Sequence, residues 1–122
     1  MYPPLFDLCS ADTSIQTLLS NGTVLRIYPF GEAVQKDPLP YVVWGVGDGT
    51  PENYLGQPPD VDSVTTHVDV YAATASEARS VMDALTSVLE LHAHVVSWDG
   101  ESRDRETRAY RVSFTVDWVL VR

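Results

Sequence analysis

The chain has 122 residues, the length of one domain (1–122), and its 8 Lys and Arg against 17 Asp and Glu give a net charge of −9. Hydrophobic residues make up 44% of the chain, which is enough to fill a core and excludes disorder as the default state. So few basic residues among so many acids exclude nucleic-acid binding as the expected function. No apolar run is long enough for a membrane span or a signal peptide, and the single Cys9 cannot form an internal disulfide.

The first twenty residues are predicted to be helical. Pro3 and Pro4 suit a first helical turn, and Asp12 can cap a second stretch that continues to about residue 20. Asn21-Gly22 then provides a stop, because both residues tolerate a left-handed backbone. One broken helix and two short helices fit this pattern equally well.

From residue 24 the hydrophobic period changes to two, which indicates strands. Short strands are predicted at 24–28, ended by Pro29, and at 41–46, with a connecting loop of about ten residues between them. Residues 47–60 are so rich in Gly and Pro that they are predicted to form a long loop exposing Tyr54 and Leu55. Long loops in small domains are usually functional or mobile.

Residues 61–73 alternate as a half-buried antiparallel strand does, and the following Thr74-Ala75-Ser76-Glu77 has the sequence of a helix-capping box. Apolar residues recur every three or four positions from 78 to 89, which predicts a helix of about four turns. A short strand at 95–98, a charged turn at 99–106 and a long alternating strand at 108–121 complete the chain.

The predicted order is therefore α-β-β-β-α-β-β. The expected fold class is α+β, with helices packed on one face of a mostly antiparallel sheet of about four to five strands. The opposite face is predicted to be polar, because 63, 65, 67 and 69 on one strand and 111, 113, 115 and 117 on another carry Ser, Thr, His, Asp and Arg. That face can be wet or can meet another subunit.

The sequence contains no assembled catalytic pattern. A metal site of His67, Asp69, His92 and His94 can be imagined, but their spacing matches no known zinc pattern. Cys9 lies on an apolar helical stripe and is expected to be a small core residue. The chain is therefore expected not to be an enzyme, to bind no metal and to need no cofactor.

Several segments resemble the tail completion, or tail terminator, proteins of long-tailed bacteriophages and prophages. They are LPYVVW (39–44), TPENYLG (50–56), VDVYA (68–72) and ASEAR (75–79), together with the opening YPPLF (2–6) and RIYP (26–29). The resemblance lies in the order of these segments and in the length of the chain, and it covers nearly all of the sequence.

The resemblance implies a structural virion protein that works at the neck of the tail. Such proteins form a homo-oligomeric ring, commonly a hexamer, which caps the head-proximal end of the tail tube and ends its polymerisation. The implied partners are further copies of the chain, the tail-tube protein and a head-completion or connector protein, first in the host cytoplasm and then in the virion. DNA passes through such a ring without being bound, and a membrane is not involved.

Within this interpretation, two groups of residues are candidates for the assembly surfaces. Glu52, Asn53, Tyr54 and Leu55 are expected at an inter-subunit or tail interface, since aromatic and aliphatic anchors contribute most of the energy of such contacts. Asp48, Asp60 and Asp62 are expected to contribute acid to the ring or its lumen, where negative charge repels DNA.

Two alternatives remain open at this point. Another head-tail connector component of the same neck would bind the portal or its adaptor instead of the tube. A small metal-dependent hydrolase would use His67, Asp69, His92 or His94, and alanine at the three histidines would abolish its activity.

Overall fold

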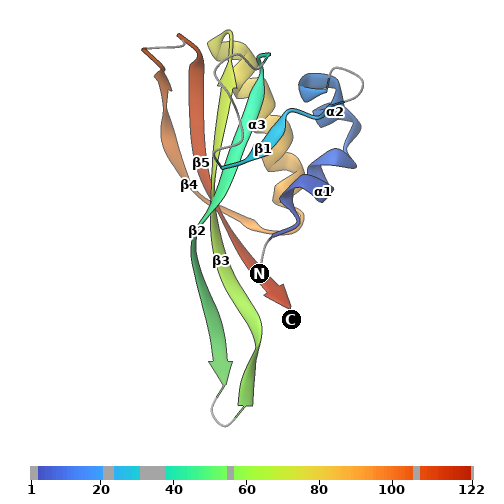
Figure 1. The fold of residues 1–122 in the computed structure, drawn as a ribbon, viewed down its shortest axis with the longest axis vertical. Helices are drawn as coiled ribbons and strands as arrows, with labels where there is room; N and C mark the ends of the chain where they lie inside the picture. Colours follow the sequence, from blue (N-terminus) through green and yellow to red (C-terminus); the bar gives the residue numbers. More distant parts are fainter. Residues whose placement is uncertain (1–2, 21–23, 31–37, 55–56, 106–107, 122) are drawn as a thin grey trace.

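The computed structural model describes residues 3–20, 24–30, 38–54, 57–105 and 108–121, with the backbone alone at 48–54, 57–61 and 121. The elements are α1 (Leu5–Ser10), α2 (Thr13–Leu19), β1 (Ile27–Pro29), β2 (Tyr41–Tyr54), β3 (Gln57–Ala72), α3 (Ala75–Leu89), β4 (His94–Arg103) and β5 (Tyr110–Val121). Their order confirms the predicted α+β class, and the N-terminal helical region consists of two short helices (Figure 1).

The strands form one five-stranded sheet in the order β1-β2-β3-β5-β4. Every neighbouring pair is antiparallel except β1 and β2, which run parallel with Ile27 opposite Val42. The sheet is therefore mixed but mostly antiparallel, and β1 and β4 are its two edge strands. The central strands β3 and β5 pair over their full common length, from Val61 opposite Val121 to Ala72 opposite Tyr110.

Helix α3 begins where the capping residue predicts. The Thr74 hydroxyl accepts a hydrogen bond of 3.1 Å from the backbone N–H of Glu77, which satisfies one of the free donors in the first turn. The helix then buries one side, and its fully buried apolar residues are Ala78, Val81, Leu85 and Leu89. The cap accounts for where this helix begins, and the hydrophobic period accounts for the side that it buries.

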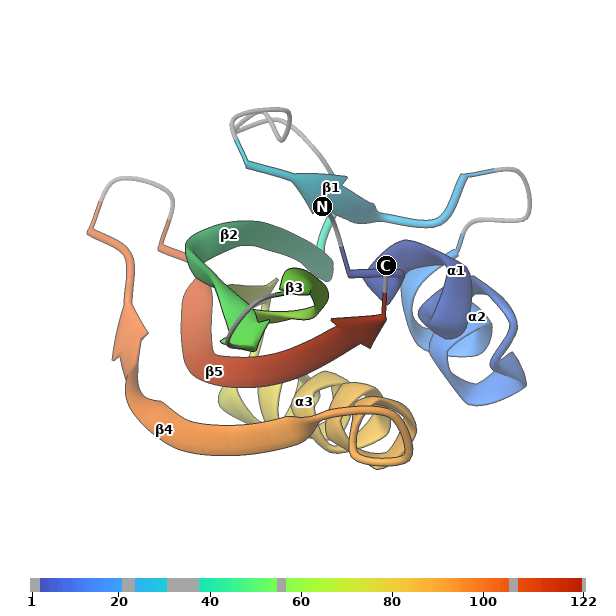
Figure 2. The ribbon, with the colours of Figure 1, turned by 90° about the horizontal axis from the view of Figure 1, so that it is seen from below.

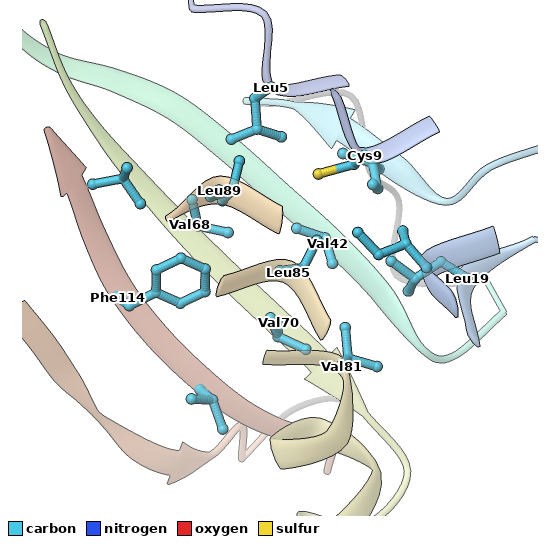
Figure 3. Close-up of a cluster of buried hydrophobic side chains, with 14 of the residues drawn as sticks. Leu5, Cys9, Leu19, Val42, Val68, Val70, Val81, Leu85, Leu89 and Phe114 are labelled. Atoms are coloured by element: carbon cyan, nitrogen blue, oxygen red, sulfur yellow. The ribbon is translucent and has the colours of Figure 1, made fainter. Parts of the chain in front are cut away.

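The core lies between α3 and one face of the sheet, with α1 and α2 beside α3 (Figures 2 and 3). Alternate residues of β3 and β5 point into it, as predicted; Val68, Val70, Phe114 and Val116 are at most 1% exposed. Burying one such side chain contributes about 1.5–3 kcal/mol to folding. Cys9 is also fully buried, and this burial raises the pKa of its thiol to about 12, so it serves as a small hydrophobic residue.

The prediction of a loop at 47–60 is wrong. This region forms the distal half of a β-hairpin in which β2 and β3 pair as far as Tyr54 opposite Gln57. Two features of this region tolerate proline. The outer edges of the distal strands are unpaired among the described residues, because β1 covers β2 only up to Trp44 and β5 covers β3 only down to Val61, and the β2–β3 register is irregular between Glu52 and Tyr54. We call residues 47–62 the arm; its distal end projects away from the body of the domain (Figure 1).

Three further boundaries differ from the prediction. Strand β1 begins only at Ile27 and includes Pro29. Strand β4 runs to Arg103, so the charged turn is shorter than the predicted 99–106. Nearly every residue of β4 is exposed, and an exposed edge strand has no alternating hydrophobic pattern that could reveal its length.

Candidate functional site

The predicted interface residues lie at the end of the arm. Glu52, Asn53 and Tyr54 are the last three residues of β2, and Leu55 lies outside the described residues. Backbone pairing places Glu52 opposite Val61 on β3. The structure thus places Glu52, Asn53 and Tyr54 at the distal end of β2, away from the helices (Figure 1).

The three predicted acidic residues are spread along both strands of the same hairpin. Asp48 lies in β2 opposite Thr65, and Asp60 lies in the distal part of β3. Asp62 lies nearer the body, between Pro51 and Leu120 in the sheet register, and its side chain is only 5% exposed. Asp62 therefore belongs to the packed root of the arm in the isolated chain.

A close contact between β2 and β3 fixes the start of the arm. The register of the two strands shifts between Val46 and Asp48, which makes Gly47 the extra residue of a bulge. A Cβ atom on Gly47 would lie 2.3 Å from His67 Nε2, so the imidazole occupies the space that only glycine leaves free. The His67 ring also lies 3.2 Å from Thr115 Oγ1, measured from Nδ1. His67 thus has a packing role at the root of the arm.

The open face of the sheet is polar, as the alternation predicts, and its groups are joined in pairs. Asp69 accepts hydrogen bonds from Arg111 Nη2 at 3.0 Å and from the Ser113 hydroxyl at 2.5 Å. The Thr65 hydroxyl donates to Asp117 at 2.7 Å. These contacts line strands β3 and β5 beside a hollow of about 400 Å³. A polar, internally paired face of this kind is compatible with both water and a polar protein interface.

Strand β4 bends over the same hollow and adds another acidic group. Asp99 accepts hydrogen bonds from the hydroxyls of Thr115 and Ser97, the latter at 2.7 Å. These two donors stabilise the carboxylate and lower the pKa of Asp99 below its ordinary value. On β3, burial and the charge of Asp69 raise the pKa of Tyr71. The hollow is thus a charged, structured surface built by three strands.

The residues of the imagined metal site do not form one in the described part of the chain. His67 and Asp69 lie on β3, whereas His92 follows α3 and His94 begins β4. No group of three or more His, Cys, Asp or Glu side chains among the described residues is arranged to hold a metal ion. The geometry therefore offers no support for a metal-dependent activity.

Two surface features were not predicted from the sequence to be candidate sites. On the edge strand β4, Val96 and Trp98 are 51% and 58% exposed, although their sequence suggested an ordinary short strand. At the end of β4, a turn rich in arginine protrudes from the sheet. For the first feature, the sequence shows only an aromatic residue outside any hydrophobic alternation. For the second, it shows only a mixture of acids and arginines. Neither pattern is specific to an interface.

The described residues define a small α+β protein with a mostly antiparallel five-stranded sheet and a projecting hairpin. The family model described as tail completion protein gp17 matches residues 3–120. The chain therefore belongs to the gp17 tail completion family, and its role is that of a structural protein of the phage tail. No curated protein matches the chain.

Two solved structures are similar in fold. A chain from the virion of a native gene transfer agent particle has a TM-score of 0.61 and 14% identity, with coverage of 97% of this chain and 92% of that chain. The gp17 protein of bacteriophage SPP1 has a TM-score of 0.58 and 14% identity, with coverage of 97% and 86%. In the described part of the chain, every helix is too short or too polar to cross a membrane.

Proposed function

We propose that this protein forms a homo-oligomeric ring, most simply a hexamer, on the head-proximal end of the tail tube. The ring ends tube polymerisation and presents the surface on which a head-completion or connector protein docks. Assembly takes place in the host cytoplasm, and the finished ring stays in the neck of the virion. Membership of the tail completion family supports a structural role at this place.

The observation that carries the proposal is the arm. Two paired strands extend beyond the third strand that would cover them, since β5 ends its pairing with β3 at Val61. An isolated two-stranded hairpin gains little stability on its own, and its exposed edges invite pairing with another chain. An arm of this kind is stabilised when it lies against a neighbouring subunit or the tube.

In this proposal Glu52, Asn53, Tyr54 and Leu55 form the contact with the neighbour or the tube. Tyr54 and Leu55 supply the apolar anchors. Asp48 and Asp60 add negative charge to the ring or its lumen, where it repels the phosphates of DNA in transit. Asp62, being buried, contributes by holding the root of the arm in place.

The decisive experiment is the solution mass of the protein by light scattering, alone and with the tail-tube protein, across a concentration range. We expect a ring-sized species in at least one of the two conditions. A monomer that ignores the tube protein in both would overturn the proposal. If the chain instead binds the portal or its adaptor, it is the other neck component considered above.

Tyr54→Ala and Gln57→Ala form a matched pair for the arm itself, because the two residues lie opposite each other at its end. Loss of an aromatic anchor is expected to weaken assembly about tenfold or more, whereas the glutamine change is expected to leave it within about twofold. Equal behaviour of the two variants would remove the arm from the interface.

A further inference from the structure

Charge is distributed unevenly between the two ends of the molecule. The arm contains Asp48, Glu52, Asp60 and Asp62 and no lysine or arginine. The segment 103–111 has the opposite balance, with four arginines against two acids in a chain whose net charge is −9. We call the described residues of this segment, 103–105 and 108–111, the arginine turn.

The backbone of the arginine turn is held in a defined shape. The Asp104 N–H donates to the carbonyl of Ala109 and the Arg108 N–H donates to the carbonyl of Asp104, both at 2.8 Å. Arg108 adopts a positive φ of 62°, which closes the turn between β4 and β5. These backbone contacts join the two described ends of the turn, and a held backbone lowers the entropic cost of docking.

Three of the four arginines of this turn make no ion pair within the described residues. Arg103, Arg105 and Arg108 are exposed. The two ion pairs found within the described residues use other arginines, namely Arg79 with Glu101 and Arg111 with Asp69. Arg103 is the most constrained of the three, with its Nε donating to the carbonyl of Arg108 at 3.1 Å and its guanidinium 5.0 Å above the Tyr110 ring.

A hollow of about 250 Å³ lies beside the turn and widens the receiving surface. It is lined by parts of α3, β4 and β5, including Arg79, Arg103, Tyr110 and Arg111. Glu101, the ion-pair partner of Arg79, lines the same hollow, so Arg103 is the arginine of this lining that makes no ion pair within the described residues. Arginine and tyrosine are the residue types that most often anchor protein interfaces.

The arm and the arginine turn lie at opposite ends of the longest axis of the molecule (Figure 1). One chain therefore cannot bring its own two charged ends together. A contact between different patches on identical subunits is heterologous, and repetition of it produces a ring where the rotation closes. Opposite charges at the two ends favour this contact and oppose arm-to-arm pairing.

We propose that the arginine turn of one copy receives the acidic arm of a second copy, so that subunits join head to tail. This inference rests on the proposed ring and names the surface that the arm occupies. Each exposed ion pair contributes only about 0.2–1 kcal/mol, so the charges set orientation and register while apolar groups add affinity. Assembly should accordingly weaken as salt rises, because salt screens exposed pairs.

The test reverses the charge of one end at a time, in two separate variants. One variant carries Arg105→Glu and Arg108→Glu, and the other carries Glu52→Arg and Asp60→Arg. Each alone places like charges at both ends and is expected to lose at least tenfold in assembly affinity, measured by sedimentation with tail-tube protein present. An equimolar mixture is expected to regain near wild-type assembly, because alternating copies then meet through opposite charges.

Glu90→Arg is the matched control, because it reverses an exposed charge that belongs to neither surface, and it is expected to assemble like the wild type. Circular dichroism of each variant should match the wild type, which separates assembly from folding. If the wild type assembles and neither reversal has an effect, the inference is overturned, while the proposed ring function is unaffected. Defective variants that the mixture does not rescue would also overturn it and would assign the turn to the tube protein. Failure of the wild type to assemble under any condition would overturn the proposed function itself.

Discussion

The body of this domain and its arm are built from the same two strands but are stabilised in different ways. Within the body, β2 and β3 are covered by further strands, and β3 also packs against α3 over a continuous apolar core. In the arm, β2 after Trp44 and β3 before Val61 have only each other as partners among the described residues. The body thus accounts for the stability of the fold, whereas the arm adds little to it, which is why we assign the arm to assembly.

The largest effect is expected from a cavity in the body. Leu85 is fully buried on α3, and Leu85→Ala should lower the free energy of unfolding by about 2–5 kcal/mol. Urea denaturation followed by circular dichroism measures this change. Leu91→Ala, at a side chain that is 78% exposed, is the control and should stay within about 0.5 kcal/mol. Similar losses in the two variants would contradict the placement of the core.

A smaller loss of stability is expected when the cap of α3 is removed. Thr74→Ala removes the hydroxyl that accepts from the Glu77 N–H and should cost about 1 kcal/mol. Ser76→Ala, one position inside the exposed first turn, provides the comparison and should change stability little. Thermal unfolding of both variants reports the difference. A neutral Thr74→Ala would show that packing alone fixes the start of the helix.

Shortening the arm should affect folding still less. Replacement of residues 52–61 by Asn-Gly would close the hairpin directly after Pro51 and before Asp62, which already lie opposite each other. Because an unsupported hairpin is marginal, the free energy of unfolding should change by less than about 1 kcal/mol. Urea denaturation tests this, and a loss as large as that of Leu85→Ala would mean that the arm is part of the folding unit.

The smallest effect concerns pH. Hydrogen bonds from Thr115 and Ser97 lower the pKa of Asp99 in the folded state, so its contribution to stability is present above the ordinary pKa of aspartate, about 4, and is lost as pH falls through the lowered value. Asp99→Asn should remove this acid-dependent contribution. Ser97→Ala should move the pKa back toward its ordinary value in an NMR titration of the carboxyl group. An unchanged pKa in that variant would contradict the role of the hydroxyl.

The same contrast explains what could be predicted from the sequence. Helix α3 and strands β3 and β5 were predictable, because a capping threonine and regular burial leave periodic traces in the residue order. The arm was not, because Pro51, Pro58 and Pro59 have the composition of a loop. Strands accept proline at unpaired edges and at irregularities of the register, and neither is visible in the sequence. The predicted strand at 95–98 was too short for a related reason, because the exposed residues of β4 show no hydrophobic alternation.

The candidate surfaces were predictable only in part. Tyr54 lies at the end of β2, in a hairpin and not in the predicted loop, and its exposure and its role at an interface stay predictions. The arginine turn could not be predicted as a partner surface for the arm. That role depends on its position at the opposite end of the molecule, which the order of residues does not reveal.

The most direct test of the account is the solution mass of the arm-shortened protein beside that of the wild type, by light scattering with and without the tail-tube protein. We predict that the wild type reaches a ring-sized mass, whereas the shortened protein, folded and of unchanged stability, stays monomeric under the same conditions. A shortened protein that still forms the ring would contradict the assignment of the arm to assembly.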